Sequence, residues 1–362
     1  MAATITREQI LEALRGVKDP ELGRDLLELG MIKGVEINGS DVVLHVELTT
    51  PACPLKGQIE RDITAALKTR VPEVNGIQIH FTAQVRSGMA GRQGEIPGVK
   101  NAIAVGSGKG GVGKSTVAAA LALALKEHGA AVGLLDADIY GPSIPVMLGV
   151  SGQPAVTEDQ MIQPLEAGGI RVMSMGFLLP KNEAVIWRGP MLHGAIQQFL
   201  HRVRWGELDY LVIDLPPTTG DVPLSLAQLI PLTGAVVVCT PQDVALADAI
   251  RAITAFRKLR IPVLGLVENM SYFKCPHCGE RTEIFGTGGA RLLAEQQGIP
   301  FLGGIPIDVS LRELSDQGRI AEVFSSDHPA REPLLEISRQ LAAQISVEAA
   351  KHARLPKLEI IQ

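Results

Sequence analysis

The chain has 362 residues, of which 46% are hydrophobic and 20% are charged, a balance that predicts a globular protein with one large and one small domain. The formal net charge of −5 provides no basic footprint, so we expect neither nucleic acid nor membrane as a partner. Four cysteines are too few for a disulfide framework, and the first residues lack the pattern of a secretory signal, so we expect a reducing cytoplasm.

The first part of the chain predicts a small α/β domain over residues 1–85. Thr6 and Gln9 match a capping box, and apolar residues follow them at helical spacing. Two β-rich runs flank the turn at residues 38–40, which is typical of a hairpin. A second helix is expected over Leu55–Lys68, and the alternating residues after it predict a further strand.

A different pattern begins after residues 86–98, whose glycine and polar residues predict a linker. In residues 99–362, continuous apolar runs recur and are mostly separated by helical segments. Strands that are apolar on both faces and alternate with helices predict a doubly wound, mainly parallel sheet. The five expected strands lie at residues 102–105, 132–135, 210–213, 235–238 and 263–267.

A phosphate-binding loop follows the first of these strands. The segment from Gly108 to Ser115 fits the pattern G-x-x-x-x-G-K-S of a P-loop NTPase and precedes an apolar helix. Its amides would surround phosphate oxygens, the Lys114 ammonium would bridge the β- and γ-phosphates of ATP, and the Ser115 hydroxyl would hold Mg²⁺. The expected nucleotide-binding residues are Gly108, Lys109, Gly110, Gly111, Val112, Gly113, Lys114, Ser115 and Thr116.

Carboxylates follow two other apolar strands. Asp214 ends the strand at 210–213, and Asp136 and Asp138 follow the strand at 132–135. Because the carboxyl ends of parallel strands meet at one edge of a sheet, these acids are expected beside the P-loop, where they would reach Mg²⁺.

The loop contains an additional lysine, Lys109. The segment KGGVGKS resembles the deviant-Walker-A ATPases, which include MinD, ParA and the nitrogenase iron protein. The resemblance implies that Lys109 neutralises phosphate charge in the partner subunit of a dimer, and that Asp138 orients the attacking water.

A cysteine pair, Cys275 and Cys278, follows the strand at 263–267 and should lie on the same edge of the sheet as the P-loop. If a dimer forms at this edge, its two-fold axis brings two such pairs together and supplies four thiolates. Four thiolates suit a 4Fe–4S cluster or zinc. His277 is expected to face solvent, and Cys239 to be a small buried strand residue.

Several segments together are similar to the Mrp/ApbC group of iron–sulfur carrier ATPases: the P-loop, LLDADIYGPSIP, WRGPM at Trp187–Met191 and VENMSYFKCPHCG. KDPELGRDLLELGMI and TTPACP resemble the MIP18-like domain often fused to bacterial members. The resemblance implies a homodimer with an interfacial 4Fe–4S cluster, a cluster donor, apoprotein recipients and weak ATPase activity. It also implies that Asn269 contacts adenine and that Ile305–Asp308 lines the base pocket.

Some alternatives stay open. Cys53 precedes an expected helix whose dipole would lower the pKa of its thiol, which suggests a transient metal ligand or a transfer thiol, although we favour a structural role. The protein could instead be a partitioning or positioning ATPase of the MinD/ParA type, or a dimeric ATPase stapled by zinc. Against the former, the stripe of Leu334, Ile337, Leu341 and Ile345 is more typical of core packing than of a membrane anchor.

Overall fold

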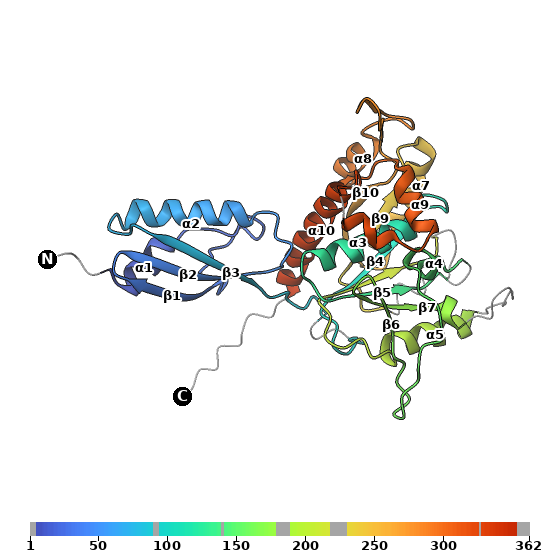
Figure 1. Cartoon of the computed structure of the whole chain (residues 1–362), viewed down its shortest axis with the longest axis horizontal. Helices are drawn as coiled ribbons and strands as arrows, with labels where there is room; N and C mark the ends of the chain where they lie inside the picture. The colour runs from blue at the N-terminus through green and yellow to red at the C-terminus, as the bar shows by residue number, and fades with distance from the viewer. Residues whose placement is uncertain are drawn as a thin grey trace. The chain divides into compact units, whose positions relative to one another are not determined.

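The computed structural model describes residues 5–89, 94–138, 141–178, 189–217, 230–325 and 327–352. The chain divides into two compact units, Met1–Arg86 and Ser87–Gln362, which are described separately (Figure 1).

The first unit packs two helices against a three-stranded sheet. At its start, Thr6 Oγ1 accepts from the Gln9 amide and the Gln9 side chain accepts from the Thr6 amide, which confirms the capping box. The sheet has the order β1-β2-β3, with β1 and β2 antiparallel and β2 and β3 parallel. The elements are α1 (Arg7–Leu14), β1 (Ile32–Asn38), β2 (Asp41–Leu48), α2 (Lys56–Arg70) and β3 (Ile77–Ala83).

The second unit is built on an eight-stranded sheet with the order β13-β10-β9-β4-β8-β5-β7-β6. All neighbouring strands are parallel except β6 and β7, which confirms the predicted α/β fold with a doubly wound, mainly parallel sheet. The strands are β4 (Ala102–Ser107), β5 (Val132–Asp136), β6 (Leu165–Ala167), β7 (Ile170–Ser174), β8 (Tyr210–Asp214), β9 (Gly234–Cys239), β10 (Val263–Glu268) and β13 (Phe301–Gly304).

Helices cover both faces of this sheet. The chain moves from β4 through α3 toward one edge and from β9 through α7 toward the other, so right-handed crossovers place α3 and α7 on opposite faces. The helices are α3 (Lys114–Glu127), α4 (Ile144–Leu148), α5 (Gly189–His201), α7 (Asp243–Lys258), α8 (Gly289–Gln297), α9 (Val309–Asp316) and α10 (Arg331–His352), with short 3₁₀ turns at Met175–Phe177 and Ile320–Phe324.

The apolar stripe of α10 is part of the core. Leu334, Ile337, Leu341 and Ile345 are each at most 1% exposed, and the helix packs on α3, β10 and β13. The stripe therefore stabilises the fold, as predicted. In the described parts of the chain, no helix has the length and apolar character needed to cross a membrane.

Some residues in the stretch expected as a linker pack closely. The Gly88 amide donates to the Lys100 carbonyl at 3.1 Å and to Asn101 Oδ1 at 3.0 Å, and Met89 and Ile96 are 1% and 2% exposed. These apolar side chains explain why the second unit begins at Ser87.

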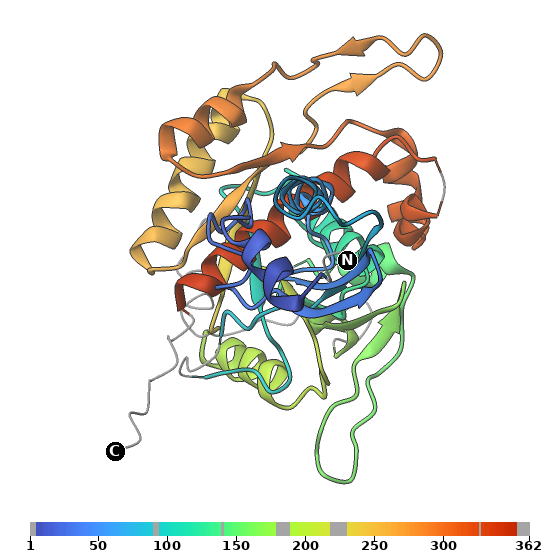
Figure 2. The ribbon, with the colours of Figure 1, turned by 90° about the vertical axis from the view of Figure 1, so that its left-hand side faces the viewer.

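A narrow hairpin separates β10 from α8. Its strands are β11 (Phe273–Lys274) and β12 (Arg281–Thr282), paired antiparallel. Figure 2 shows the two short orange strands extending away from the body of the second unit. The hairpin carries the predicted cysteine pair at its tip.

Candidate functional site

The P-loop turns tightly between β4 and α3, and two of its glycines lie where a side chain would not fit. Gly113 has a φ of 79°, and a Cβ there would lie 2.2 Å from Asn269 Nδ2. Asn269 Nδ2 donates to the Val112 carbonyl at 2.9 Å, so the residue after β10 is fixed against the loop. A Cβ at Gly108 would lie 2.1 Å from the Asp248 carbonyl of α7. The loop is thus held from two sides.

A cavity of about 1010 Å³ opens beside this loop. Its lining includes the P-loop lysines, Asp138 and Asn269, together with Pro306 and Ile307. The segments predicted to bind phosphate and base therefore share one cavity, whose volume lies at the upper end of the usual range for small-molecule sites.

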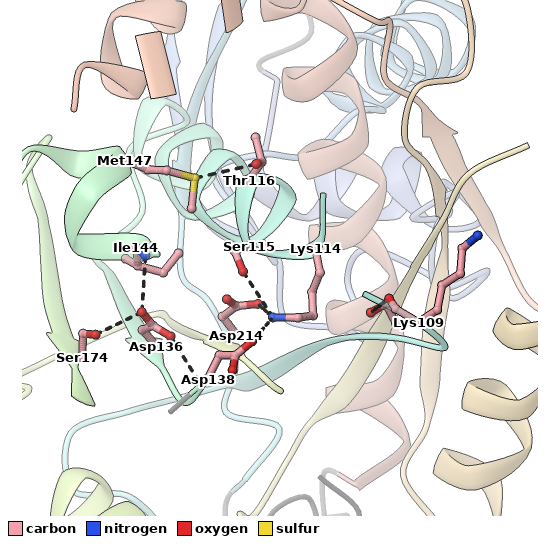
Figure 3. A network of polar contacts seen from close by, with 11 residues as sticks. Lys109, Lys114, Ser115, Thr116, Asp136, Asp138, Ile144, Met147, Ser174 and Asp214 are labelled. Carbon is pink, nitrogen blue, oxygen red and sulfur yellow. Dashed lines mark hydrogen bonds and ion pairs between the residues drawn. The ribbon is translucent and has the colours of Figure 1, made fainter. Parts of the chain in front are cut away.

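Lys114 lies at the centre of the polar network in Figure 3. Its Nζ is 2.6 Å from Asp214 Oδ1, 3.2 Å from Ser115 Oγ and 3.7 Å from Asp138 Oδ2. The side chains of Lys114 and Asp214 are 7% and 0% exposed, so the ion pair is shielded from solvent. The ammonium predicted to bind phosphate is thus paired with a carboxylate of its own chain.

Asp214 offers a fitting oxygen donor for a cation. Burial raises the pKa of its carboxyl, and the neighbouring Lys114 opposes that shift. Its Oδ2 atom is buried and has no hydrogen-bond partner among the described residues. Ser115 and Asp138 supply further oxygens close by, and hard oxygen donors are what Mg²⁺ prefers. The residues fit the cation.

Asp136 has a structural role in addition to the one we expected. Its Oδ1 accepts from the Asp138 amide at 3.1 Å, and its Oδ2 accepts from the Ile144 amide at 3.3 Å and from Ser174 Oγ at 3.0 Å. Burial first, and the charge of Asp214 second, raise the pKa of Asp136 to about 7. Through these hydrogen bonds Asp136 organises the loop after β5, and the expectation that it reaches Mg²⁺ stays a prediction.

Lys109 differs from Lys114 in its surroundings. It is half-buried, and in Figure 3 its ammonium points away from Lys114 and Asp214. Its carbonyl accepts from Ser107 Oγ at 2.9 Å, which fixes the backbone. Within the described ranges no carboxylate pairs with its ammonium, which leaves the charge available to a ligand or a second subunit.

The cysteine pair lies on a tight turn between β11 and β12. The Cys275 amide donates to the Glu280 carbonyl and the Gly279 amide donates to the Cys275 carbonyl, each at 2.9 Å. Backbone hydrogen bonds from Cys278 and then His277 lower the pKa of the Cys275 thiol. Cys278 and His277 are exposed, as expected for the histidine. The backbone therefore favours thiolate at an accessible position.

This turn does not complete a metal site alone. Among the residues whose placement is described, no group of three or more histidine, cysteine and acidic side chains could hold a metal ion. The structure thus offers two thiols on each chain, whereas soft metals usually take four ligands.

The two other cysteines are poor ligands. Cys239 is 1% exposed on β9, which confirms the buried strand residue, and burial raises the pKa of its thiol to about 12. Cys53 Sγ donates to Glu21 Oε1 at 3.2 Å. Burial first, and the charge of Glu21 second, raise the pKa of Cys53 to about 12. The expectation that the helix dipole lowers this pKa is wrong, because burial and a carboxylate outweigh the one amide, of Leu55, that favours the thiolate.

Three further side chains near the site were not predicted. Glu268 ends β10, where its carboxylate accepts from Ser271 Oγ at 2.5 Å and from the Ala290 amide at 3.1 Å. Ile284 and Phe285, after β12, line the cavity beside the P-loop. An acid at the end of an apolar strand, and an apolar pair inside a polar stretch, are signals that could have identified them.

One predicted motif cannot be placed. Trp187 and Arg188 of the WRGPM segment lie outside the described residues, and the remainder begins α5.

Family models match both units. Residues 98–342 match the ParA family, described as NUBPL iron-transfer P-loop NTPase. Residues 7–80 match the family of iron–sulfur cluster assembly proteins. The boundary between the two matches lies close to the division of the structure after Arg86.

Individual proteins are similar to this chain in sequence and in fold. The iron–sulfur cluster carrier protein of Deinococcus radiodurans is 56% identical over 342 residues, covering 94% of this chain and 96% of that protein. The nucleotide-binding protein of Archaeoglobus fulgidus, solved in complex with ADP, is 47% identical, has a TM-score of 0.58, and the match covers 66% of this chain and 92% of that one. The cell division ATPase MinD of Pyrococcus furiosus is 22% identical with a TM-score of 0.50, over 66% of this chain and 97% of that one, and shares the fold.

Proposed function

The chain belongs to the NUBPL iron-transfer P-loop NTPase family, and from this premise we propose that it is an iron–sulfur carrier that holds a 4Fe–4S cluster between two copies of itself. It receives the cluster from a donor and passes it to apoproteins, and it binds and hydrolyses ATP weakly. The proposed setting is a reducing cytoplasm, where exposed thiols persist.

The observation that carries this proposal is the turn at Cys275 and Cys278. It presents an accessible thiol whose pKa is lowered, next to a second exposed thiol, with no third ligand among the described residues. Two such turns, related by a two-fold axis, would provide the four thiolates that a 4Fe–4S cluster takes. The exposed position also suits a cargo, because an apoprotein must reach the cluster to accept it.

The nucleotide half of the proposal rests on the P-loop and its acids. The loop amides and Lys114 would bind the phosphates of ATP, and Asn269 and residues 305–308 would contact the base. Ser115 and Asp214 would hold Mg²⁺, which supplies positive charge to the phosphates. Asp138 would orient the attacking water. Lys109, whose ammonium points away from Lys114 and Asp214 of its own chain, would act on the partner's nucleotide.

A partitioning or positioning ATPase has less support. Its membrane contact would need an amphipathic segment, and the stripe of α10 is buried within the fold. No observation on the described residues favours this second function.

The test is reconstitution. The full chain is incubated anaerobically with iron and sulfide, and iron, sulfide and zinc are counted per dimer. We expect about four irons and four sulfides per two chains, in keeping with one 4Fe–4S cluster. The variant Cys275→Ser should lose them, and Cys53→Ser, which removes a thiol from the first unit, should retain them. A full complement of iron in Cys275→Ser, or zinc in place of iron in the wild type, would contradict the proposal.

A further inference from the structure

The outgoing limb of the cysteine hairpin is bonded to the wall of the nucleotide cavity. The Ser271 amide donates to the Ile305 carbonyl at 2.8 Å, and the Ile307 amide donates to the Tyr272 carbonyl at 2.6 Å. Ile307 is itself part of the cavity lining. The residues that immediately precede β11 are therefore bonded directly to this wall.

The return limb reaches the same cavity directly. Ile284 and Phe285 follow β12 and line the cavity together with the P-loop, although they are 52% and 38% exposed. Exposed apolar side chains at the rim of a cavity gain free energy when a ligand covers them. Both limbs of the hairpin thus border the place where a nucleotide would lie.

A single buried carboxylate fixes the two ends of this segment. Glu268 is 2% exposed, and its oxygens accept from Ser271 Oγ at the beginning of the hairpin and from the Ala290 amide at the beginning of α8. The next residue, Asn269, donates to the P-loop at Val112. The base of the hairpin is therefore anchored to the P-loop.

Contacts between the two limbs of the hairpin extend from its base to its tip. Arg281 lies over the ring of Tyr272, with Cζ at 4.0 Å from the ring centre, which links the two limbs. The amide of Cys275 is bonded to the carbonyl of Glu280 at the start of the turn. These contacts tie the two limbs of the hairpin to each other between its base and the cysteine turn.

From these contacts we propose that Ile284 and Phe285 close on the base and ribose of a bound adenine nucleotide, and that nucleotide occupancy thereby sets the position of Cys275 and Cys278. The inference rests on the proposed function for its purpose, which is to make release of the cluster depend on nucleotide. Because coupling is reciprocal, the state of the cysteine turn should also change nucleotide affinity.

The test uses metal-free full-length protein, MgADP and a thiol reagent. The reaction rate of Cys275 and Cys278 with dithiobisnitrobenzoate is measured with and without saturating MgADP, and a Cys275→Ser/Cys278→Ser variant provides the blank. We expect MgADP to slow the reaction by about fivefold, in the usual range of coupling between sites. In Ile284→Ser/Phe285→Ser, most of the effect at saturating nucleotide should be lost, and the Kd for MgADP should rise roughly tenfold.

Two controls separate coupling from damage. Leu292→Ser removes an apolar side chain that is 55% exposed on α8 and is not in the cavity lining, so it should respond as the wild type does. Phe285→Leu keeps an apolar contact and should retain most of the effect. Thermal unfolding of each variant checks the fold.

The inference is overturned if MgADP leaves the wild-type rate unchanged, or if the double serine variant still responds fully. Failure of the carrier function is a separate outcome, because it is measured by iron in reconstituted protein, whereas both readouts here use protein without metal.

Discussion

The nucleotide site and the cysteine turn lie in the same unit but are built on opposite plans. Lys114 and Asp214 are almost fully buried, and each has its charged partner within its own chain (Figure 3). Cys275 is half-buried and Cys278 is exposed. Backbone hydrogen bonds favour the thiolate form of Cys275. The first site is assembled before any ligand arrives, whereas the second offers half of a ligand set.

The difference in burial between the two sites follows from what each one binds. Phosphate binding benefits from fixed dipoles in a dry pocket, because such dipoles need no reorganisation when the anion arrives. A cluster that is handed to another protein must remain reachable, so its ligands cannot be enclosed. The expected effects of substitution differ accordingly.

The largest expected effect is on ATP turnover, when the lysine that is expected to act on the partner's nucleotide is removed. Lys109→Ala should lower ATP turnover by about 1000-fold, since a cation that stabilises transferred phosphate in trans is typically worth that much. Nucleotide binding should change little, because Lys109 points away from its own Lys114 and Asp214. Turnover and the Kd for MgADP are measured on the same preparation.

Mixing provides the control for this prediction. A Lys114→Ala chain still has Lys109, so mixed dimers of the two variants contain one complete site, and equimolar mixing should restore about a quarter of the wild-type turnover. If the mixture stays inactive, Lys109 does not act across a dimer.

The second prediction tests whether Asp136, beside the nucleotide site, is shielded from solvent, by measuring how stability depends on pH. The pKa of Asp136 is raised from 3.8 to about 7, so the folded chain keeps a proton that the unfolded chain releases. This contribution to stability is fully present below about pH 4 and is lost as the pH rises through 7, a change of about 4 kcal/mol. About 2.5 kcal/mol of this change falls between pH 5 and pH 8, where denaturant unfolding at the two pH values measures it.

Asp136→Asn is the matched variant, because asparagine has a similar shape and cannot titrate. It should remove most of this loss of stability between the two pH values, whatever its effect on stability at a single pH. An unchanged difference would mean that Asp136 is solvated and ordinary.

The third prediction compares two thiols. Cys53 has a pKa of about 12, whereas backbone hydrogen bonds lower the pKa of Cys275. At pH 8 the metal-free protein should be alkylated by iodoacetamide at Cys275 at least about 100-fold faster than at Cys53, because the thiolate is the reacting form. Peptide mass spectrometry over a time course measures both rates.

Glu21→Gln tests whether the charge of Glu21 helps to raise the pKa of Cys53. Removing this charge should accelerate the alkylation of Cys53 and leave that of Cys275 unchanged, so the ratio of the two rates should fall. Equal rates for the two thiols in the wild type would show that their surroundings do not control reactivity.

The smallest expected effect concerns the bracing of the cysteine turn. Tyr272→Leu removes the ring beneath Arg281, an interaction worth about 0.5–1 kcal/mol at an exposed site. Hydrogen exchange at the Cys275 amide should therefore be about threefold faster. Amides of β4, in the centre of the sheet, serve as the internal reference. No acceleration would mean that the turn is held by its backbone alone.

Much of the fold could be predicted from the sequence because its signals are local and continuous. The five apolar runs became the central strands, and the P-loop pattern predicted that an apolar helix, α3, follows the loop. The strands β6, β7 and β13 were not predicted, since their residues are less uniformly apolar and their pairing depends on the rest of the sheet.

The chemistry of individual side chains was harder to predict. The surroundings of Cys53 include Glu21, which is 32 positions away in the chain, so local sequence suggested a lowered pKa where the fold raises it. Asp136 and Asp138 both follow an apolar strand, and only the bonds to Ile144 and Ser174 reveal that Asp136 also holds the loop after β5. Partners that are distant in sequence decide such cases.

The ion pair between Lys114 and Asp214 has a consequence for the proton balance of binding. A nucleotide that takes Lys114 for its phosphates leaves Asp214 buried without its counter-charge. Without a divalent cation, the carboxylate must recover a proton from solvent, so uptake of free ATP should consume protons and weaken as the pH rises. Calorimetry in two buffers of different ionisation enthalpy should reveal this uptake with ATP alone and a smaller one with MgATP, and equal heats in both buffers would mean that Asp214 stays charged.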